Sequence, residues 1–74
     1  MKAYATIYTH RYGTDVEIFS TRELAEVYRN EVARDNWNDE IPDKPMPDMN
    51  VGDSYFDIIH DEFFDIVECV LDSK

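Results

Sequence analysis

Residues 2–23 read KAYATIYTHRYGTDVEIFSTRE, and this stretch contains the signals of a β-hairpin that leads into a helix. Over residues 2–9 the side chains alternate with a period of two, with Tyr4, Thr6 and Tyr8 on one side and Ala3, Ala5 and Ile7 on the other. Alternation among β-branched and aromatic residues predicts a strand. Gly13 can adopt a positive φ angle near the tip of a short loop. Residues 15–19 are predicted to return as a second strand, with Val16 and Ile18 on one face.

A helix signal follows the second strand. Ser20 and Glu23 have the spacing of a capping box, in which the serine hydroxyl accepts from the Glu23 amide and the Glu23 side chain reaches back to Ser20. The sequence predicts a helix from this box to about residue 36. Its apolar stripe is expected to contain Leu24, Ala25, Val27, Tyr28 and Val32. Pro42 and the prolines after it exclude a longer helical segment.

The second half of the chain is less regular. Residues 38–52 contain three prolines and Gly52, and they predict a long exposed loop of the kind that carries function. Asp53 is predicted to cap a short second helix that ends at His60 and buries Tyr55, Phe56, Ile58 or Ile59. Residues 62–71 fit both a helix and a strand. A strand is favoured, because a lone two-stranded hairpin is marginally stable and needs a third partner.

These elements predict a single α+β domain, residues 1–74, with the order β-β-α-α-β and an antiparallel three-stranded sheet covered by helices on one face. A chain of 74 residues suits one small domain, and 43% hydrophobic residues supply a thin core. The single cysteine, Cys69, forms no internal disulfide, which fits a reducing compartment such as the cytoplasm. The sequence also lacks an apolar signal core and a membrane-spanning stretch.

The charge is distributed unevenly along the chain. The net charge is −10, yet residues 1–34 contain five acids and five bases and are balanced. Residues 35–74 contain twelve acids and two lysines, and therefore carry the whole imbalance. Because nucleic acids and anionic membranes are polyanions, the protein is not expected to bind either of them directly.

The side chains that could act in catalysis or bind a metal do not form a catalytic pattern. The carboxylates have the spacing of a solvated surface, and a catalytic pair needs environments that push two pKa values apart. His10, His60 and Cys69 lack the paired spacing of a zinc site, although His60 and Cys69 with a carboxylate remain an alternative. Residues 35–40 fail the calcium-loop pattern, which leaves a surface calcium or magnesium site as a second alternative. The expectation is a protein that is not an enzyme and binds no cofactor or metal.

The acid-rich half is predicted to bind a Lys/Arg-rich protein surface, most obviously on a nucleic-acid-binding complex. Asp53, Asp57 and Asp61 would line one face of the second helix, since residues four apart are helical neighbours. In a C-terminal strand, Asp65 would lie on one face, with Glu68 and Asp72 on the other. The predicted contact residues are Asp39, Glu40, Asp43, Asp48, Asp53, Asp57, Asp61, Asp65, Glu68 and, as an apolar anchor, Trp37. Tyr12, Met46 and Met49 are further anchor candidates. The alternative for the acidic half is that its charge only confers solubility. The alternative for the anchor candidates is that they belong to the core.

The acid-dense residues 35–72, together with a capped β-β-α start at residues 4–7, 16–19 and 20–36, resemble the small acidic proteins of bacteriophages. Anti-CRISPR proteins and other DNA-mimic inhibitors belong to that group. The resemblance implies steric occupation of a nucleic-acid site on a host defence complex in the host cytoplasm, without enzymatic activity. The rival hypothesis is a structural or oligomeric interaction module that pairs through a strand edge or aromatic residues, as a homodimer that buries Tyr4, Tyr8 and Phe19. Monomer and homodimer both remain open.

Overall fold

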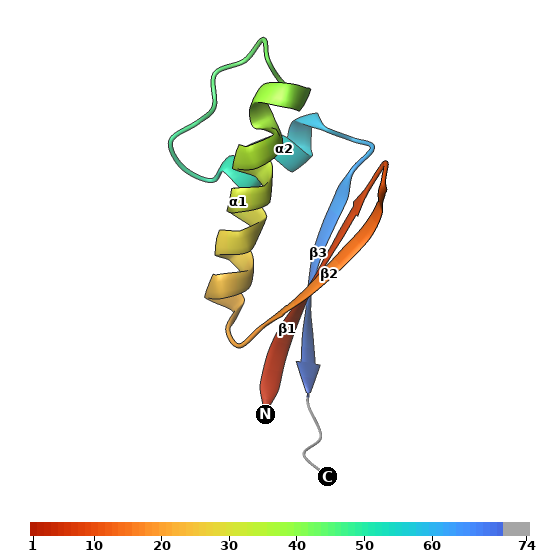
Figure 1. Ribbon diagram of the computed structural model, residues 1–74. Coiled ribbons are helices and arrows are strands. Elements are labelled where there is room, and N and C mark those ends of the chain that lie inside the picture. The colour runs from red at the N-terminus through yellow and green to blue at the C-terminus, as the bar shows by residue number, and fades with distance from the viewer. Residues whose placement is uncertain (71–74) are drawn as a thin grey trace.

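Strand β1 (Lys2–His10) is the centre of the sheet in the computed structural model, which describes residues 1–70. It pairs with β2 (Gly13–Phe19) on one side and with β3 (Phe63–Val70) on the other, both antiparallel, in the order β2-β1-β3. Helices α1 (Arg22–Glu40) and α2 (Val51–Ile58) lie against one face of this sheet (Figure 1). The predicted α+β fold, with the order β-β-α-α-β and helices on one face, is confirmed.

The hairpin forms where the sequence predicts it. Gly13 has a φ angle of 134°, which residues with a side chain rarely adopt, and it closes the turn opposite His10. The prediction of a C-terminal strand rather than a helix is also correct, because β3 pairs with β1 along its whole length. Leu71 and Asp72, which the sequence placed at the end of this segment, lie outside the described residues.

Helix α1 begins one residue later than the capping box implies. Its N-cap is Thr21, whose hydroxyl accepts from the Leu24 amide at 3.2 Å, so the predicted Ser20 cap is wrong. Phe19 is still paired with Tyr4 in the sheet, and Ser20 is therefore needed for the turn from strand to helix. The helix ends at Glu40 instead of residue 36, just before Ile41 and Pro42.

The buried stripe of α1 also differs from the prediction. The buried residues are Ala25, Ala33 and Trp37, which are spaced by multiples of four and face the sheet and α2. Leu24 and Val27 are 49% and 52% exposed, so their predicted place in the buried stripe is wrong.

Helix α2 obtains its N-terminal cap from α1 rather than from Asp53. Asn50, which precedes the helix, has a φ of 56° and no side-chain cap bond, whereas Asn30 accepts from the Gly52 amide at 2.8 Å. A Cβ atom on Gly52 would lie 2.8 Å from Asn30 Oδ1, so glycine leaves room for the Asn30 side chain that caps the helix. Because α2 ends at Ile58, the predicted extension to His60 is wrong.

The connection between the helices is shorter and more tightly packed than the predicted loop over residues 38–52. It spans residues 41–50, and Ile41 is only 3% exposed. Trp37 Nε1 donates to the Lys44 carbonyl at 2.9 Å, and Met46 packs on the core, so the loop is only partly exposed.

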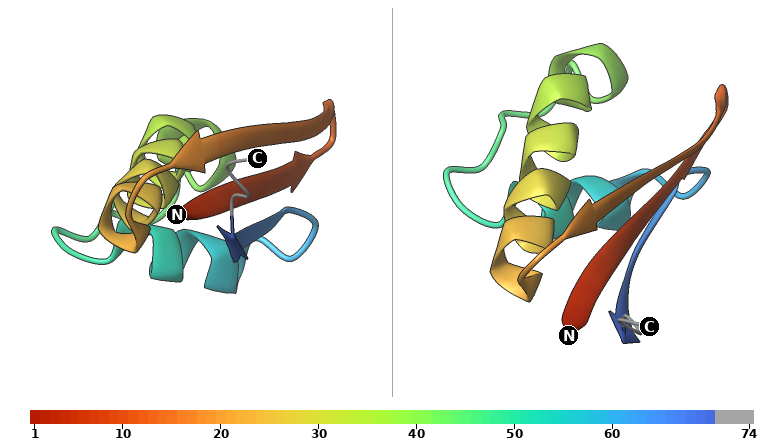
Figure 2. Two further views of the ribbon diagram at one scale, coloured as in Figure 1. Left: turned by 90° about the horizontal axis from the view of Figure 1, so that it is seen from below. Right: turned by 60° about the horizontal axis from the view of Figure 1, so that its bottom comes forward.

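The core has two connected parts on the helix side of the sheet. The first lies between the helices and contains Ala33, Trp37, Ile41, Val51 and Tyr55. The second is a layer of aromatic rings between helices and sheet, formed by Tyr8, Phe19, Tyr28, Phe56 and Phe64. The opposite face of the sheet is not covered by either helix (Figure 2). None of the helices within residues 1–70 has the length and apolar character needed to span a membrane.

Candidate functional site

Trp37 is the one predicted contact residue that the fold removes from the surface. Its side chain is 2% exposed and packs 6.4 Å from the Tyr55 ring, measured between centroids. The reason is that α1 continues to Glu40, which places Trp37 one turn after Ala33 on the buried side of the helix. Trp37 therefore belongs to the core, and its prediction as an exposed anchor is wrong.

Three of the predicted contact carboxylates are paired with bases from the N-terminal half. Glu40 accepts two hydrogen bonds from Arg11 Nη2, at 2.7 and 2.9 Å, and it is the main cause of the raised pKa of Arg11. Asp53 pairs with Arg29 at 2.5 Å, and Glu68 lies 3.6 Å from the Lys2 ammonium. These three carboxylates are partly neutralised within the molecule and present less net charge to a partner.

Two of the predicted contact residues lie away from the rest. Asp65 pairs in register with Ile7 and is on the sheet face that the helices leave uncovered. Glu68 is opposite Tyr4, toward the end of the sheet where β1 begins. The predicted row of Asp53, Asp57 and Asp61 on one helix face is also broken, because Asp61 follows the end of α2. The ten predicted residues thus do not form one continuous surface.

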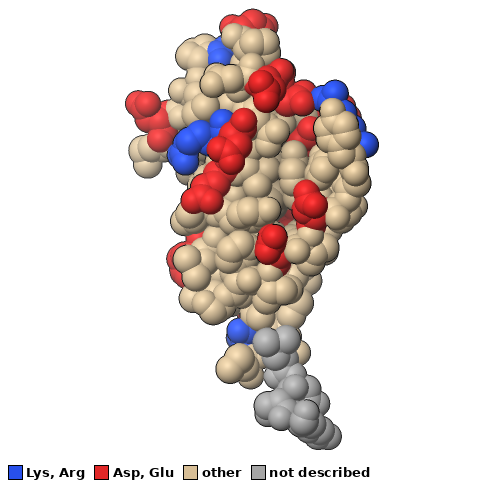
Figure 3. Space-filling view, in the orientation of Figure 1, with Lys and Arg blue, Asp and Glu red and all other residues tan. Residues whose placement is uncertain are grey.

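We call the remaining five carboxylates the acidic end: Asp39, Asp43, Asp48, Asp57 and Asp61. They come from the C-terminal turn of α1, the connection, α2 and the segment before β3. All five are exposed, and within residues 1–70 none of them is in a salt bridge. Figure 1 places these segments away from the end of the sheet where β1 starts. In Figure 3, most red side chains on the visible face lie in this half, with blue side chains among them.

Glu62 is a buried carboxylate, although the sequence analysis grouped it with the acids of a solvated surface. It is only 7% exposed, and its Oε1 atom accepts from the Tyr8 hydroxyl at 2.6 Å and from the Tyr55 hydroxyl at 3.0 Å. The pKa of both tyrosines is raised, mainly because the hydroxyls are buried and secondly because they donate to Glu62. A signal was present in the sequence, because Glu62, Phe64 and Ile66 alternate on the face that meets the helices.

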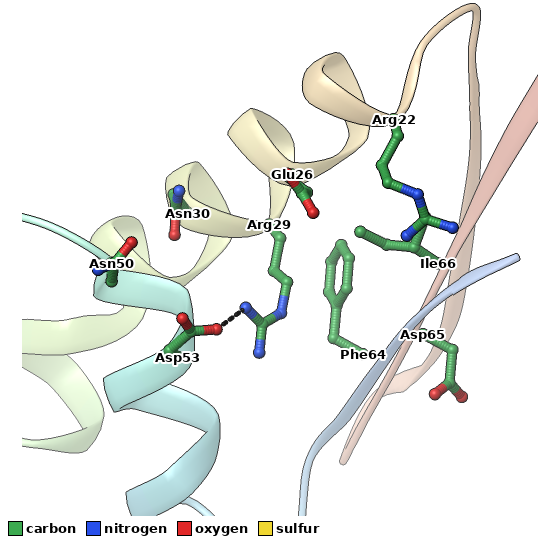
Figure 4. Close-up of a pocket in the computed structure, with 9 residues that line it drawn as sticks. All are labelled: Arg22, Glu26, Arg29, Asn30, Asn50, Asp53, Phe64, Asp65 and Ile66. Atoms are coloured by element: carbon green, nitrogen blue, oxygen red, sulfur yellow. Dashed lines mark hydrogen bonds and ion pairs between the residues drawn. The ribbon is translucent and has the colours of Figure 1, made fainter.

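An open groove of about 560 Å³ lies between α1, the start of α2 and the β3 edge (Figure 4). The Arg29 guanidinium points toward Asp53 across it and lies 5.2 Å from the Phe56 ring centroid. The Arg22 side chain also extends toward β3, whereas the Asp65 carboxylate points away from the groove. Since Glu26 and Asp53 accompany the two arginines, the lining carries both signs of charge and does not form a strong anion site.

The histidines and the cysteine are dispersed. His10 Nε2 lies 2.8 Å from Asp15 at the hairpin end, His60 is exposed after α2, and Cys69 is half-buried on β3. Within the part of the chain that the structure describes, no three His, Cys, Asp or Glu side chains are close enough together to hold a metal ion.

The acidic end can attract a cationic surface, because its carboxylates are exposed and none of them is in a salt bridge within residues 1–70. Comparisons with protein-family models, with curated proteins and with solved structures find no match to this chain, and its surface geometry is therefore the basis for a functional proposal.

Proposed function

We propose that this protein is a non-enzymatic inhibitor of the anti-CRISPR type, which docks its acidic end onto the basic nucleic-acid-binding surface of a host defence complex in the host cytoplasm. The observation that carries the proposal is that five exposed carboxylates, Asp39, Asp43, Asp48, Asp57 and Asp61, are in no salt bridge within residues 1–70. Such a group can replace phosphates on a Lys/Arg-rich surface and exclude nucleic acid from it.

The packing of α1 against α2 positions the carboxylates that these helices carry, Asp39 and Asp57. Trp37 and Tyr55 pack the end of α1 against α2, and the Trp37 bond to the Lys44 carbonyl fixes the connection that carries Asp43 and Asp48. A pre-organised group of charges loses less conformational entropy on binding than charges on a flexible tail. Complementary charge also speeds encounter with the partner, and this effect falls with added salt.

A matched pair of variants tests the proposal. The first removes four charges from the acidic end by Asp39→Asn, Asp43→Asn, Asp57→Asn and Asp61→Asn. The control removes four exposed charges elsewhere by Glu17→Gln, Glu23→Gln, Glu26→Gln and Glu31→Gln. Both sets change the net charge equally, so a difference between them reports position rather than total charge.

Tagged protein is used to recover partners from host lysate at low salt, and the affinity of the main partner is then measured for each variant. The acidic-end set should weaken binding about 100-fold, from roughly 0.5–1 kcal/mol per carboxylate. The control set should weaken it less than tenfold, and added DNA or RNA should compete with the wild-type protein. Equal effects of the two sets, or a bound complex that retains its nucleic acid, would show that charge mimicry is not the mechanism.

A further inference from the structure

The uncovered side of the sheet is an apolar surface in a chain that is otherwise rich in charge. Residues paired in the antiparallel registers share a face, so this surface, the open face, is defined by the register. It consists of Ala3, Ala5, Ile7, Thr9, Thr14, Val16, Ile18, Phe63, Asp65, Val67 and Cys69. Asp65 is its only charged residue, although 32% of the whole chain is charged.

The large apolar side chains of the open face are exposed to an unusual extent. Val16 is 57% exposed, Ile18 60%, Phe63 59% and Val67 44%. If a large side chain offers roughly 150–250 Å², these four together expose on the order of 400 Å². The largest apolar patch on a typical monomer is about 300–600 Å² and often functional. The open face reaches that range with four of its residues.

The open face has the shape of a trough with two ridges. Ala3 and Ala5 on the central strand are 4% and 8% exposed even though no helix covers them, because Ile18 on β2 and Val67 on β3 stand on either side of Ala5. At one end, Met1, Ala3 and Ile18 line an apolar hollow of about 370 Å³. The same surface therefore offers both projecting side chains and a recess for them.

We infer that the open face binds a second copy of this chain, and forms a two-fold symmetric dimer in which the two sheets pack face to face. A symmetric dimer requires a self-complementary surface, and ridges beside a trough meet that requirement. Among the described residues of this face, a basic partner would find one carboxylate, Asp65. The ridge at Ile18 of one copy lies in the alanine trough of the other, with the sheets about 10 Å apart.

The sheet residues Tyr4, Tyr8 and Phe19, which the sequence suggested as dimer contacts, lie on the helix side and are not part of this interface. The four large apolar side chains offer on the order of 400 Å² on each copy, or about 800 Å² in total, which is below the roughly 1,200–2,000 Å² of stable protein interfaces. We therefore expect a dissociation constant in the micromolar range.

The mass in solution, measured by sedimentation over a range of protein concentrations, tests the dimer. The expected result is a shift from 8.8 kDa to twice that mass as the concentration rises. Ile18→Lys and Val67→Lys should each raise the dissociation constant more than tenfold, because each places a charge on a ridge that packs against the other sheet. The control is Val27→Lys, which changes an equally exposed apolar residue on α1 and should leave the dimer intact. Circular dichroism confirms that each variant is folded.

The single cysteine gives a second readout on the unmodified protein. Cys69 lies on the open face, so its reaction with a thiol reagent should slow as the dimer forms. Added salt should strengthen the dimer, since two chains of net charge −10 repel each other, whereas it should weaken the proposed contact of the acidic end with a basic partner. The inference is overturned if the protein stays monomeric at high concentration, or if the dimer persists with both lysine variants.

Discussion

The buried carboxylate of Glu62 allows a sharp test of what stabilises this fold. Two tyrosine hydroxyls, from Tyr8 on β1 and Tyr55 on α2, donate to the same Oε1 atom. Glu62→Ala would leave both without their acceptor, and a buried hydroxyl without a partner costs about 1–3 kcal/mol. For two hydroxyls, the expected loss is about 2–6 kcal/mol of the free energy of unfolding. A domain of this length has roughly 4–11 kcal/mol in total, so the variant should be close to unfolding.

Two further variants separate the hydrogen bonds from the charge. Glu62→Gln keeps an oxygen in the same place and loses only the charge assistance, so its expected cost is about 1 kcal/mol. Glu68→Ala removes an exposed carboxylate that accepts from Tyr4 at 3.2 Å, and it should cost less than about 0.5 kcal/mol.

Urea unfolding followed by circular dichroism measures each free energy, and an unchanged dependence on urea confirms that the variants unfold in the same way. Adding Tyr55→Phe to Glu62→Ala should recover part of the loss, because it removes one of the unpaired hydroxyls. The reasoning is refuted if Glu62→Ala costs no more than Glu62→Gln, or no more than Glu68→Ala.

Three other outcomes follow from the structure. Gly52→Ala should destabilise by about 1–2 kcal/mol in thermal unfolding, because the added Cβ meets Asn30 Oδ1 at 2.8 Å and breaks the cap of α2; an unchanged melting temperature would contradict this close approach. Thr21→Ala should lower the free energy of unfolding by about 1 kcal/mol and Ser20→Ala by only a few tenths, because Thr21 is the N-cap of α1. The reverse order would mean that Ser20 is the N-cap, as the capping box predicts. In an alkaline titration the free energy of unfolding should stay level to about pH 10, the tyrosine pKa of the unfolded chain, and then fall. The reason is that the folded state raises the pKa of Tyr8, Tyr28 and Tyr55, so it holds their protons where the unfolded chain releases them; level stability above that pH would refute it.

The order of the elements could be predicted because its signals are local. Alternation over residues 2–9, the glycine at position 13 and the polar residues before α1 act over a few residues each, and the structure has the hairpin and helix where they indicate. The third strand could be predicted because a two-stranded hairpin is marginally stable without another strand beside it. By contrast, the cap at Thr21 and the end of α1 at Glu40 depend on where Phe19 leaves the sheet and on the burial of Trp37, which are tertiary facts.

The candidate site was only partly predictable, because the sequence gives the number of carboxylates but not their partners. Arg11 and Arg29 come from the balanced half of the chain and reach Glu40 and Asp53 across 29 and 24 residues. Pairing over such separations leaves no local pattern. The acidic end is therefore smaller than the acid-rich half from which it comes.

The sequence by itself determined the charge, its concentration in residues 35–74, and the sequence of strands and helices, since these depend on composition and on short-range periodicity. Only the tertiary structure decided which residues are accessible. It buried Trp37 and Glu62, paired three carboxylates with bases and, within residues 1–70, placed both helices on the other side of the sheet from the open face. The physical reason is that burial and ion pairing depend on which elements pack together in three dimensions, and a two-layer fold has one sheet face without a helix.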